Sequence, residues 1–297
     1  MRSRIGILAV TAVAAIVLTG CVDNSTPPEP GGDTSAEIAV DEAAAALLPE
    51  DIASAGTLVI GIDLNYAPNE FKDDSGNAKG WSVDLADAMA AKLGLTTDYR
   101  PSGFDKILPS VTGGTYDIGY SSFTDNVERE KTVDFVNYYS AGIQWAQPIG
   151  KDVDPDNACG LTVSVQATTY EETDELPAKS DACVQAGKEP ISILKFDTQD
   201  EATSALALGR ADAMSADSPI TLYAISQLDD KIEPAGESFD TAPYGIAVDK
   251  GNTELAAAIQ AALQSLVDDG TYDDILSEWG VTDGGISEIT INAASAG

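Results

Sequence analysis

The chain lacks the side chain that most hydrolytic enzymes use as a base. Its 297 residues contain no histidine, which removes the commonest general base, the commonest metal ligand and every Ser-His or Cys-His nucleophile pair. Its 49 acidic residues could supply a carboxylate pair for glycoside cleavage, although most of them must be solvated surface charges. We therefore expect a protein that is not an enzyme and that holds neither a metal nor a cofactor.

Net charge narrows the range of partners. The formal charge at pH 7 is −33, and a surface this acidic repels both nucleic acid and anionic lipid headgroups. The composition therefore excludes polyanions, and nucleic acid above all, as binding partners.

The first residues have the pattern of a secretion signal. A basic start precedes an uncharged, largely apolar run over residues 5–18, which is shorter than the roughly 20 residues of a comfortable bilayer span. The junction at residues 18–21, Leu-Thr-Gly-Cys, resembles the bacterial lipobox. We predict that residues 1–20 are removed and that Cys21 anchors the protein by lipid to the outer face of the cytoplasmic membrane. Ordinary cleavage that leaves Cys21 free is the alternative.

Lipidation of Cys21 leaves the other two cysteines, Cys159 and Cys183, as a pair. Outside the cell such a pair favours a disulfide, worth roughly 3 kcal/mol for a loop of about 25 residues. A metal site is the rival interpretation, but two thiols with no histidine make a poor zinc site. We predict the disulfide.

The elements that must position any binding groups start after a polar, Pro- and Gly-rich stretch. We predict residues 21–50 to be a flexible tether that includes a short alanine-rich helix ending near Pro49. Residues 57–62 are typical of a strand buried on both faces of a parallel sheet. Strand and helix patterns then alternate through helix 81–93, helix 104–111, strand 116–121, strand 161–165, helix 198–208 and strand 211–215. This alternation predicts an α/β fold with open, mostly parallel sheets flanked by helices.

The length of this alternation predicts two lobes, because about 230 residues exceed one comfortable core. Two extended stretches, residues 137–149 and 239–248, are the predicted hinge strands, and residues 252–279 have a helical period broken at Gly270. The predicted boundaries are lobe 1 over residues 51–146, lobe 2 over 147–242, a return segment of lobe 1 over 243–284 and a C-terminal tail over 285–297.

Seven sequence blocks in order resemble family 3 extracytoplasmic solute-binding proteins. They lie at residues 56–61, 80–85, 113–118, 128–135, 163–169, 209–213 and 243–248, and the resemblance covers about residues 56–280. It implies a periplasmic-binding-protein-like fold in which two α/β lobes close over an amino acid or a similar small polar solute. It also implies a monomer that delivers this ligand to an ABC permease in the membrane.

The resemblance assigns the ligand's carboxylate to Arg129 and Thr124. Arginine suits this role because its planar fork donates two parallel hydrogen bonds. Ser122 falls where the family often offers a backbone carbonyl to the ammonium group, although the local sequence alone fits a polar turn that caps a helix. We expect the other two arginines after residue 20, Arg100 and Arg210, to lie on the surface.

Asp217 matches the family aspartate that holds the ammonium group from the second lobe. Its local sequence fits a helix N-cap before Pro219 equally well. Because Arg129 and Asp217 belong to opposite predicted lobes, a zwitterion that bridges them would favour the closed form.

The remaining candidates are one acidic, two polar and three aromatic residues. They are Asp63 as a second acidic group, Gln166 and Thr169 as polar contacts, and Tyr66, Trp81 and Phe104 as aromatic walls or core residues. Residues 165–169 lack the glycine that relatives usually have, so either the loop is shorter or Thr168 replaces that glycine. This departure leaves the side-chain specificity open.

Two other classes of function stay open. Related folds include dehydratases and murein lytic enzymes, and here only Asp63, Glu70 or Asp217 could serve as the acid or base. A ligand sensor is the third class, but no kinase-like region or membrane span follows before Gly297.

Overall fold

The computed structural model describes residues 38–294. The predicted signal peptide (residues 1–20), the lipidation site Cys21, most of the predicted tether and residues 295–297 lie outside this part of the chain. Within residues 38–294, no helix has the length and apolar character that a bilayer span requires.

Lobe 1 is built around β1 (Thr57–Ile62), whose side chains at Leu58, Ile60 and Ile62 are fully buried. It pairs in parallel with β5 (Thr96–Pro101) and β6 (Ile118–Thr124). One large apolar cluster joins this sheet to α3 (Trp81–Lys92), α8 (Thr253–Asp269) and α9 (Thr271–Trp279). A separate cluster joins the sheet to α4 (Phe104–Thr112).

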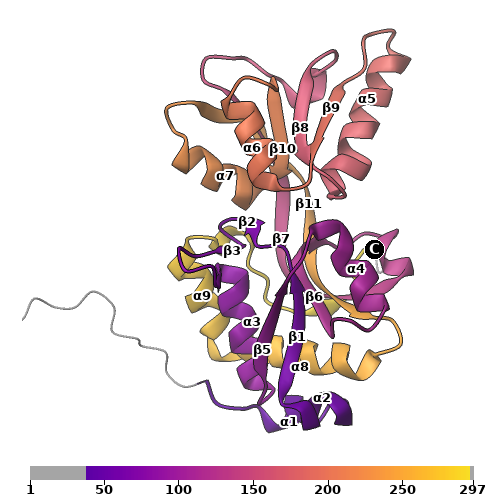
Figure 1. Cartoon of the computed structure of the whole chain (residues 1–297), viewed down its shortest axis with the longest axis vertical. Helices are drawn as coiled ribbons and strands as arrows, with labels where there is room; N and C mark the ends of the chain where they lie inside the picture. Colours follow the sequence, from indigo (N-terminus) through magenta and orange to yellow (C-terminus); the bar gives the residue numbers. More distant parts are fainter. Residues whose placement is uncertain (1–37, 295–297) are drawn as a thin grey trace, which may run out of the picture. The chain divides into compact units, whose positions relative to one another are not determined.

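Lobe 2 repeats this plan on a smaller scale (Figure 1). Its β8 (Thr162–Gln166) pairs in parallel with β9 (Ser192–Phe196) and β10 (Ala213–Asp217). The helices are α5 (Leu176–Gln185), α6 (Gln199–Ala207) and α7 (Ser218–Gln227). The predicted disulfide is present and links Cys159, before β8, to Cys183 on α5, with the two Cα atoms 5.5 Å apart.

Two long antiparallel strands, β7 (Val133–Pro148) and β11 (Ile232–Asp249), run through both lobes (Figure 1). They pair with β6 in lobe 1 and with β10 in lobe 2, which gives the strand order β5-β1-β6-β11-β7-β10-β8-β9. Their register shifts between Ala235 and Ala242. The predicted two-lobed α/β fold with two hinge strands is therefore confirmed.

Shorter elements complete the described chain. A small sheet joins β2 (Asn65–Tyr66), β3 (Glu70–Lys72) and β4 (Ala78–Lys79). The other short helices are η1 (Arg129–Lys131), η2 (Pro155–Asn157), η3 (Glu171–Glu175) and η4 (Thr282–Gly284).

Both ends of the described chain pack onto lobe 1, which differs from the predicted tether and tail. Instead of one helix ending near Pro49, α1 (Glu42–Ala45) is capped by Asp41, and α2 (Glu50–Ala55) begins after the proline. Ala44 is buried in the lobe 1 cluster. At the other end, β12 (Thr290–Ile291) pairs with β7 and Ile289 is buried. The packed chain therefore starts before residue 50 and continues beyond residue 285.

Candidate functional site

A polar pocket lies where the strand ends of the two lobes face each other, the usual ligand edge of open α/β sheets. The space between its lining atoms, including its opening, is about 280 Å³. All but one of the predicted ligand-binding residues line it: Asp63, Tyr66, Phe104, Ser122, Thr124 and Arg129 from lobe 1, and Gln166, Thr169 and Asp217 from lobe 2. Sequence reasoning missed Ser121, Tyr170 and Glu171, which also line the pocket.

Arg129 begins η1, five residues after the strand β6 ends at Thr124. Its Nη1 donates to the Thr124 carbonyl oxygen at 2.8 Å, and its Nη2 donates to the Thr168 carbonyl oxygen of lobe 2 at 2.9 Å. The guanidinium carbon lies 5.8 Å from the ring centres of both Phe104 and Phe123. Burial lowers the pKa of Arg129, although a guanidinium stays charged at neutral pH. Its remaining N–H groups are available to an anion.

Asp217 ends β10 and occupies the N-cap position of α7, yet its side chain makes no capping hydrogen bond. Its Oδ2 instead accepts a 2.6 Å hydrogen bond from the Tyr66 hydroxyl of lobe 1. Only 7 % of Asp217 is exposed, and burial raises the pKa of this carboxyl well above its usual range, with the nearby Glu171 adding to the effect. The N-cap interpretation of Asp217 therefore accounts for its place in the chain but not for the direction of its side chain.

Asp63 follows β1 and is buried at a second contact between the lobes. Its Oδ2 accepts a 2.8 Å hydrogen bond from Gln166 Nε2 of lobe 2, and its Oδ1 accepts a 2.6 Å bond from Asn65 Nδ2. Its backbone N–H donates to Ser121 Oγ at 3.0 Å. Burial raises the pKa of Asp63 because it destabilises the carboxylate form. A cationic neighbour would therefore stabilise this second carboxyl in its ionised form.

Ser122 adopts a left-handed backbone conformation, with φ of 49°. Its hydroxyl donates to Glu70 Oε2 at 3.0 Å and accepts from Asn69 Nδ2 at 2.9 Å. Glu70 is fully buried, and burial raises the pKa of this carboxyl well above its ordinary value. The hydroxyl of Ser122 is thus tied to the interior of lobe 1.

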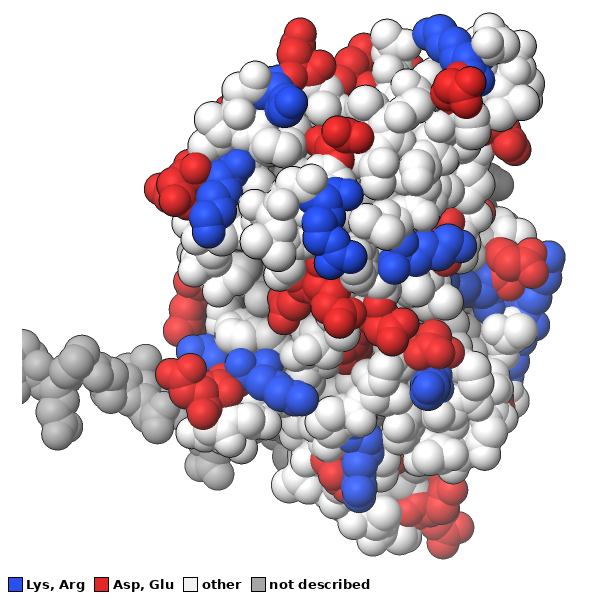
Figure 2. All heavy atoms as spheres, turned by 45° about the horizontal axis from the view of Figure 1, so that its top comes forward, with Lys and Arg blue, Asp and Glu red and all other residues white. Residues whose placement is uncertain are grey.

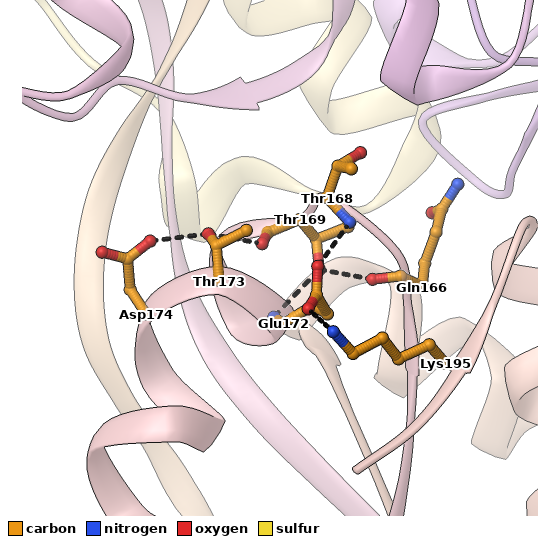
Figure 3. Close-up of polar contacts among 7 residues, drawn as sticks. All are labelled: Gln166, Thr168, Thr169, Glu172, Thr173, Asp174 and Lys195. Atoms are coloured by element: carbon orange, nitrogen blue, oxygen red, sulfur yellow. Dashed lines mark hydrogen bonds and ion pairs between the residues drawn. The ribbon is translucent and has the colours of Figure 1, made fainter.

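The lobe 2 side of the pocket is held by the polar network drawn in Figure 3. Thr168 has a φ of 65°, a conformation that favours glycine and strains other residues. Its backbone N–H donates to Glu172 Oε2 at 2.9 Å, and Glu172 forms an ion pair with Lys195. The hydroxyl of Thr169 donates to the Gln166 carbonyl oxygen at 2.9 Å. Of the two explanations for the missing glycine, its replacement by Thr168 fits this geometry.

Trp81 is the predicted candidate that does not line the pocket. It is fully buried in the core of lobe 1, its Nε1 donates to Asn69 Oδ1 at 2.7 Å, and its ring centre lies 4.5 Å from that of Tyr139. Of the two alternatives, aromatic wall or core residue, Trp81 is a core residue. Arg100 and Arg210 are exposed, as predicted.

Three carboxyls, those of Asp63, Glu171 and Asp217, line the pocket together with the single guanidinium of Arg129. A wider groove adjoins the pocket at Asp63 and carries Asp105 and Asp197 as well as Lys72 and Lys106. In Figure 2, acidic side chains gather across the middle of the displayed face, with basic side chains around them. The pocket itself has an excess of negative charge that a cation would neutralise. Among residues 38–294, no three or more acidic or cysteine side chains are arranged so that they could hold a metal ion.

Two α/β lobes joined by two strands, with a charged pocket between them, define a two-lobed small-ligand-binding protein. A comparison with known protein families identifies one of them. Residues 58–282 match the model of the bacterial extracellular solute-binding proteins, family 3. The chain belongs to this family.

Several relatives resemble the chain over most of its length. The arginine-binding protein ArgT of Corynebacterium glutamicum is 42 % identical over 300 residues, which cover 98 % of this chain and 95 % of ArgT. An ancestral arginine-binding protein bound to arginine is 35 % identical with a TM-score of 0.70, over 75 % of this chain and 98 % of that one. The ancestral amino acid-binding protein AncCDT-1, a precursor of cyclohexadienyl dehydratase, is 31 % identical with a TM-score of 0.68, over 79 % of this chain and 99 % of its own.

Proposed function

We propose that this protein captures a basic amino acid, with L-arginine as the preferred ligand, and encloses it between its two lobes. The observation that carries the proposal is the charge of the pocket, where three carboxyls accompany one guanidinium. A charge removed from water must find an opposite partner. Arginine offers one carboxylate for the guanidinium and two cationic groups for the carboxyls, whereas a neutral amino acid offers only one cationic group.

The proposed roles follow the positions of the side chains. Arg129 binds the ligand's carboxylate with the help of Thr124 and Thr169, and Asp217 binds its α-ammonium group, as does the backbone carbonyl of Ser122. Asp63 takes the cationic end of the ligand side chain, with Gln166 beside it and with Tyr66 and Phe104 as walls. A ligand held by Arg129 of lobe 1 and Asp217 of lobe 2 makes its full set of contacts only in the closed form, which is the differential binding that closure requires.

The relatives support the same ligand. Arginine appears in the names of both ArgT and the ancestral arginine-binding protein. The family further supports a role in import, in which the protein hands its ligand to an ABC permease and works as a monomer outside the cytoplasm. A lipid on Cys21 would keep it at the membrane surface.

Isothermal titration calorimetry with L-arginine and L-citrulline tests the ligand assignment. Citrulline has nearly the same shape as arginine but an uncharged ureido group. We expect L-arginine to bind at least about tenfold more tightly, because a charge-assisted hydrogen bond contributes about 1.5–3 kcal/mol. Asp63→Asn should remove most of this preference. Equal affinities for the two compounds in the wild type would contradict the basic-ligand proposal.

The same samples test binding against catalysis. We expect L-arginine incubated overnight with the protein to be recovered unchanged by mass spectrometry. A new product would favour an enzyme, the alternative suggested by AncCDT-1, which is a precursor of a dehydratase.

A further inference from the structure

We propose that Glu171 is a second anionic partner of the ligand's α-ammonium group and that, before the ligand binds, Glu171 and Asp217 hold one proton between them. Ligand capture then releases this proton to the solvent. The inference rests on the proposed function, because it requires a ligand with an ammonium group, but it does not depend on the nature of the ligand's side chain.

Glu171 combines complete burial with an unused acceptor. Its side chain lines the pocket, only 1 % of the residue is exposed, and Oε1 has no hydrogen-bond partner within residues 38–294. Removing a carboxylate oxygen from water without a replacement partner is costly. A donor that enters the pocket would satisfy this oxygen.

The neighbouring acids of η3 differ from Glu171 in this respect. Glu172 accepts from the Thr168 backbone and pairs with Lys195. Glu175 accepts hydrogen bonds from Trp145 Nε1 at 3.1 Å and Ser215 Oγ at 3.0 Å. Because η3 is a π-helix, a form that occurs frequently at functional sites, its spacing differs from that of an α-helix. Glu172 and Glu175 are buried as well but are bound to other parts of the protein, whereas Glu171 lines the pocket.

Glu171 and Asp217 lie side by side, and several charged or titratable groups face them. These are Arg129 from η1, Tyr66 from β2, Tyr244 from β11, Tyr170 just before η3, and Glu175 within η3. Burial raises the pKa of Glu171 as well as that of Asp217. Two dehydrated carboxyls in contact do not ionise together readily, so one proton is shared between them.

An ammonium group changes this balance. It brings three N–H donors, which is enough for both Asp217 and the free Oε1 of Glu171. Both carboxyls are then stabilised as carboxylates, and the shared proton passes to the buffer while the ligand keeps its own ammonium protons. The number of protons therefore balances, with one fewer on the protein and one more on the buffer.

The first test compares Glu171→Gln with the matched control Glu175→Gln in the same short helix. We expect Glu171→Gln to weaken the binding of L-arginine and of L-citrulline by a similar factor, roughly tenfold to a hundredfold. Glu175 does not line the pocket, and its raised pKa of about 8 leaves it mostly protonated at pH 7. Glu175→Gln should therefore bind within about threefold of the wild type.

The second test counts protons. Calorimetric titrations with L-arginine at pH 7, in two buffers with different ionisation enthalpies, measure the protons released per ligand bound. We expect a release approaching one proton for the wild type and for Glu175→Gln, and little or none for Glu171→Gln. Loss of structure alone would not remove the proton release while leaving binding measurable.

The outcomes separate the two proposals. If L-arginine and L-citrulline bind the wild type equally, the basic-ligand proposal fails, while the effect of Glu171→Gln on either compound still tests Glu171. If Glu171→Gln binds and releases protons like the wild type, the role of Glu171 is overturned. Thermal unfolding checks that the variant folds, and Glu171→Met, which removes the charge with little change in volume, replaces it if it does not. A wild type that binds no free amino acid overturns both proposals.

Discussion

The two lobes hold their halves of the pocket by different means. In lobe 1, Arg129 lies close to the rings of Phe104 and Phe123, which belong to the apolar cluster at α4. In lobe 2, Asp217 and Glu171 stand beside a strained loop that is fixed mainly by the carboxylate of Glu172. The cation of the pocket thus combines aromatic packing with hydrogen bonds to the carbonyl oxygens of Thr124 and Thr168, whereas the loop beside the lobe 2 carboxyls is held by a polar network. Substitutions in the two lobes should therefore have different consequences.

The largest expected effect comes from the guanidinium of lobe 1. Arg129→Ala leaves the buried carboxyls and the ligand's carboxylate without their cation, and loss of one partner of a buried pair costs about 3–5 kcal/mol. Affinity for L-arginine, measured by calorimetry, should fall by at least about a hundredfold. Arg210→Ala, on an exposed turn, is the matched control and should bind like the wild type. An Arg129→Ala protein of normal affinity would rule out the assigned clamp.

Removal of the disulfide should affect lobe 2 selectively. The double substitution Cys159→Ala and Cys183→Ala should lower the free energy of unfolding by about 3 kcal/mol, since the open loop gains conformational freedom in the unfolded chain. Hydrogen exchange measured by mass spectrometry should show faster exchange in β8 and α5 but not in β1 and β5. Equal acceleration in both lobes would argue against their independence.

A pH-dependent effect is expected in lobe 1, where Asp125 is buried beside Glu130. Burial raises the pKa of Asp125 to about 6, above its value in the unfolded chain. The folded protein therefore holds this proton more tightly, and ionisation of Asp125 costs stability as the pH rises through 6. Asp125→Asn removes this ionisation and should raise the free energy of unfolding by about 1 kcal/mol at pH 8. This gain is smaller than the free energy that corresponds to the whole pKa shift, because an amide is an imperfect replacement for the carboxyl group.

Chemical denaturation at pH 8 and at pH 4.5 measures this difference. We expect the advantage of Asp125→Asn to shrink at the lower pH, where the wild-type carboxyl is itself protonated. A gain that is the same at both pH values would contradict the assignment to Asp125.

The smallest effect concerns the strained residues, which occur in both lobes. Thr168→Gly should stabilise the protein by about 0.5 kcal/mol, because glycine adopts a positive φ without strain but also increases the conformational entropy of the unfolded chain. Ser122→Gly relieves a similar conformation but removes the hydroxyl that bonds Glu70 and Asn69, so no gain is expected. Thermal unfolding of the two variants side by side tests this difference, and equal gains would show that the hydroxyl of Ser122 contributes nothing.

Sequence patterns predicted the lobe 1 side of the pocket better than the lobe 2 side. Strand ends and block order placed Arg129, Thr124 and Asp63, because regular strands bring their ends to one edge of the sheet. Glu171 was missed since it stands in the acidic run 171–175, which looks like a solvated surface and has no helical period. Glu172 and Glu175 of this run are buried too, but of the three only Glu171 lines the pocket, and no local propensity encodes which acid does so.

The ends of the folded unit were misjudged for a related reason. Residues 38–50 and 285–294 are short and weakly periodic, so they resemble linkers until the surface that receives them is known. Trp81 was undecided because an aromatic residue suits a pocket wall and a core equally well. In each case the deciding information is a tertiary contact and not a local preference.

The C-terminal segment has a practical consequence for work with this protein. The backbone N–H of Ala293 donates to Asp125 Oδ2 at 2.9 Å, and Asn292 Nδ2 donates to Asp134 Oδ1 at 2.8 Å. Asp125 lies four residues before Arg129 in the chain. A shortened version that stops near residue 285 would lose both hydrogen bonds and the pairing of β12 with β7. Expression variants designed for crystallisation or as biosensors should therefore retain the chain at least through Ala293.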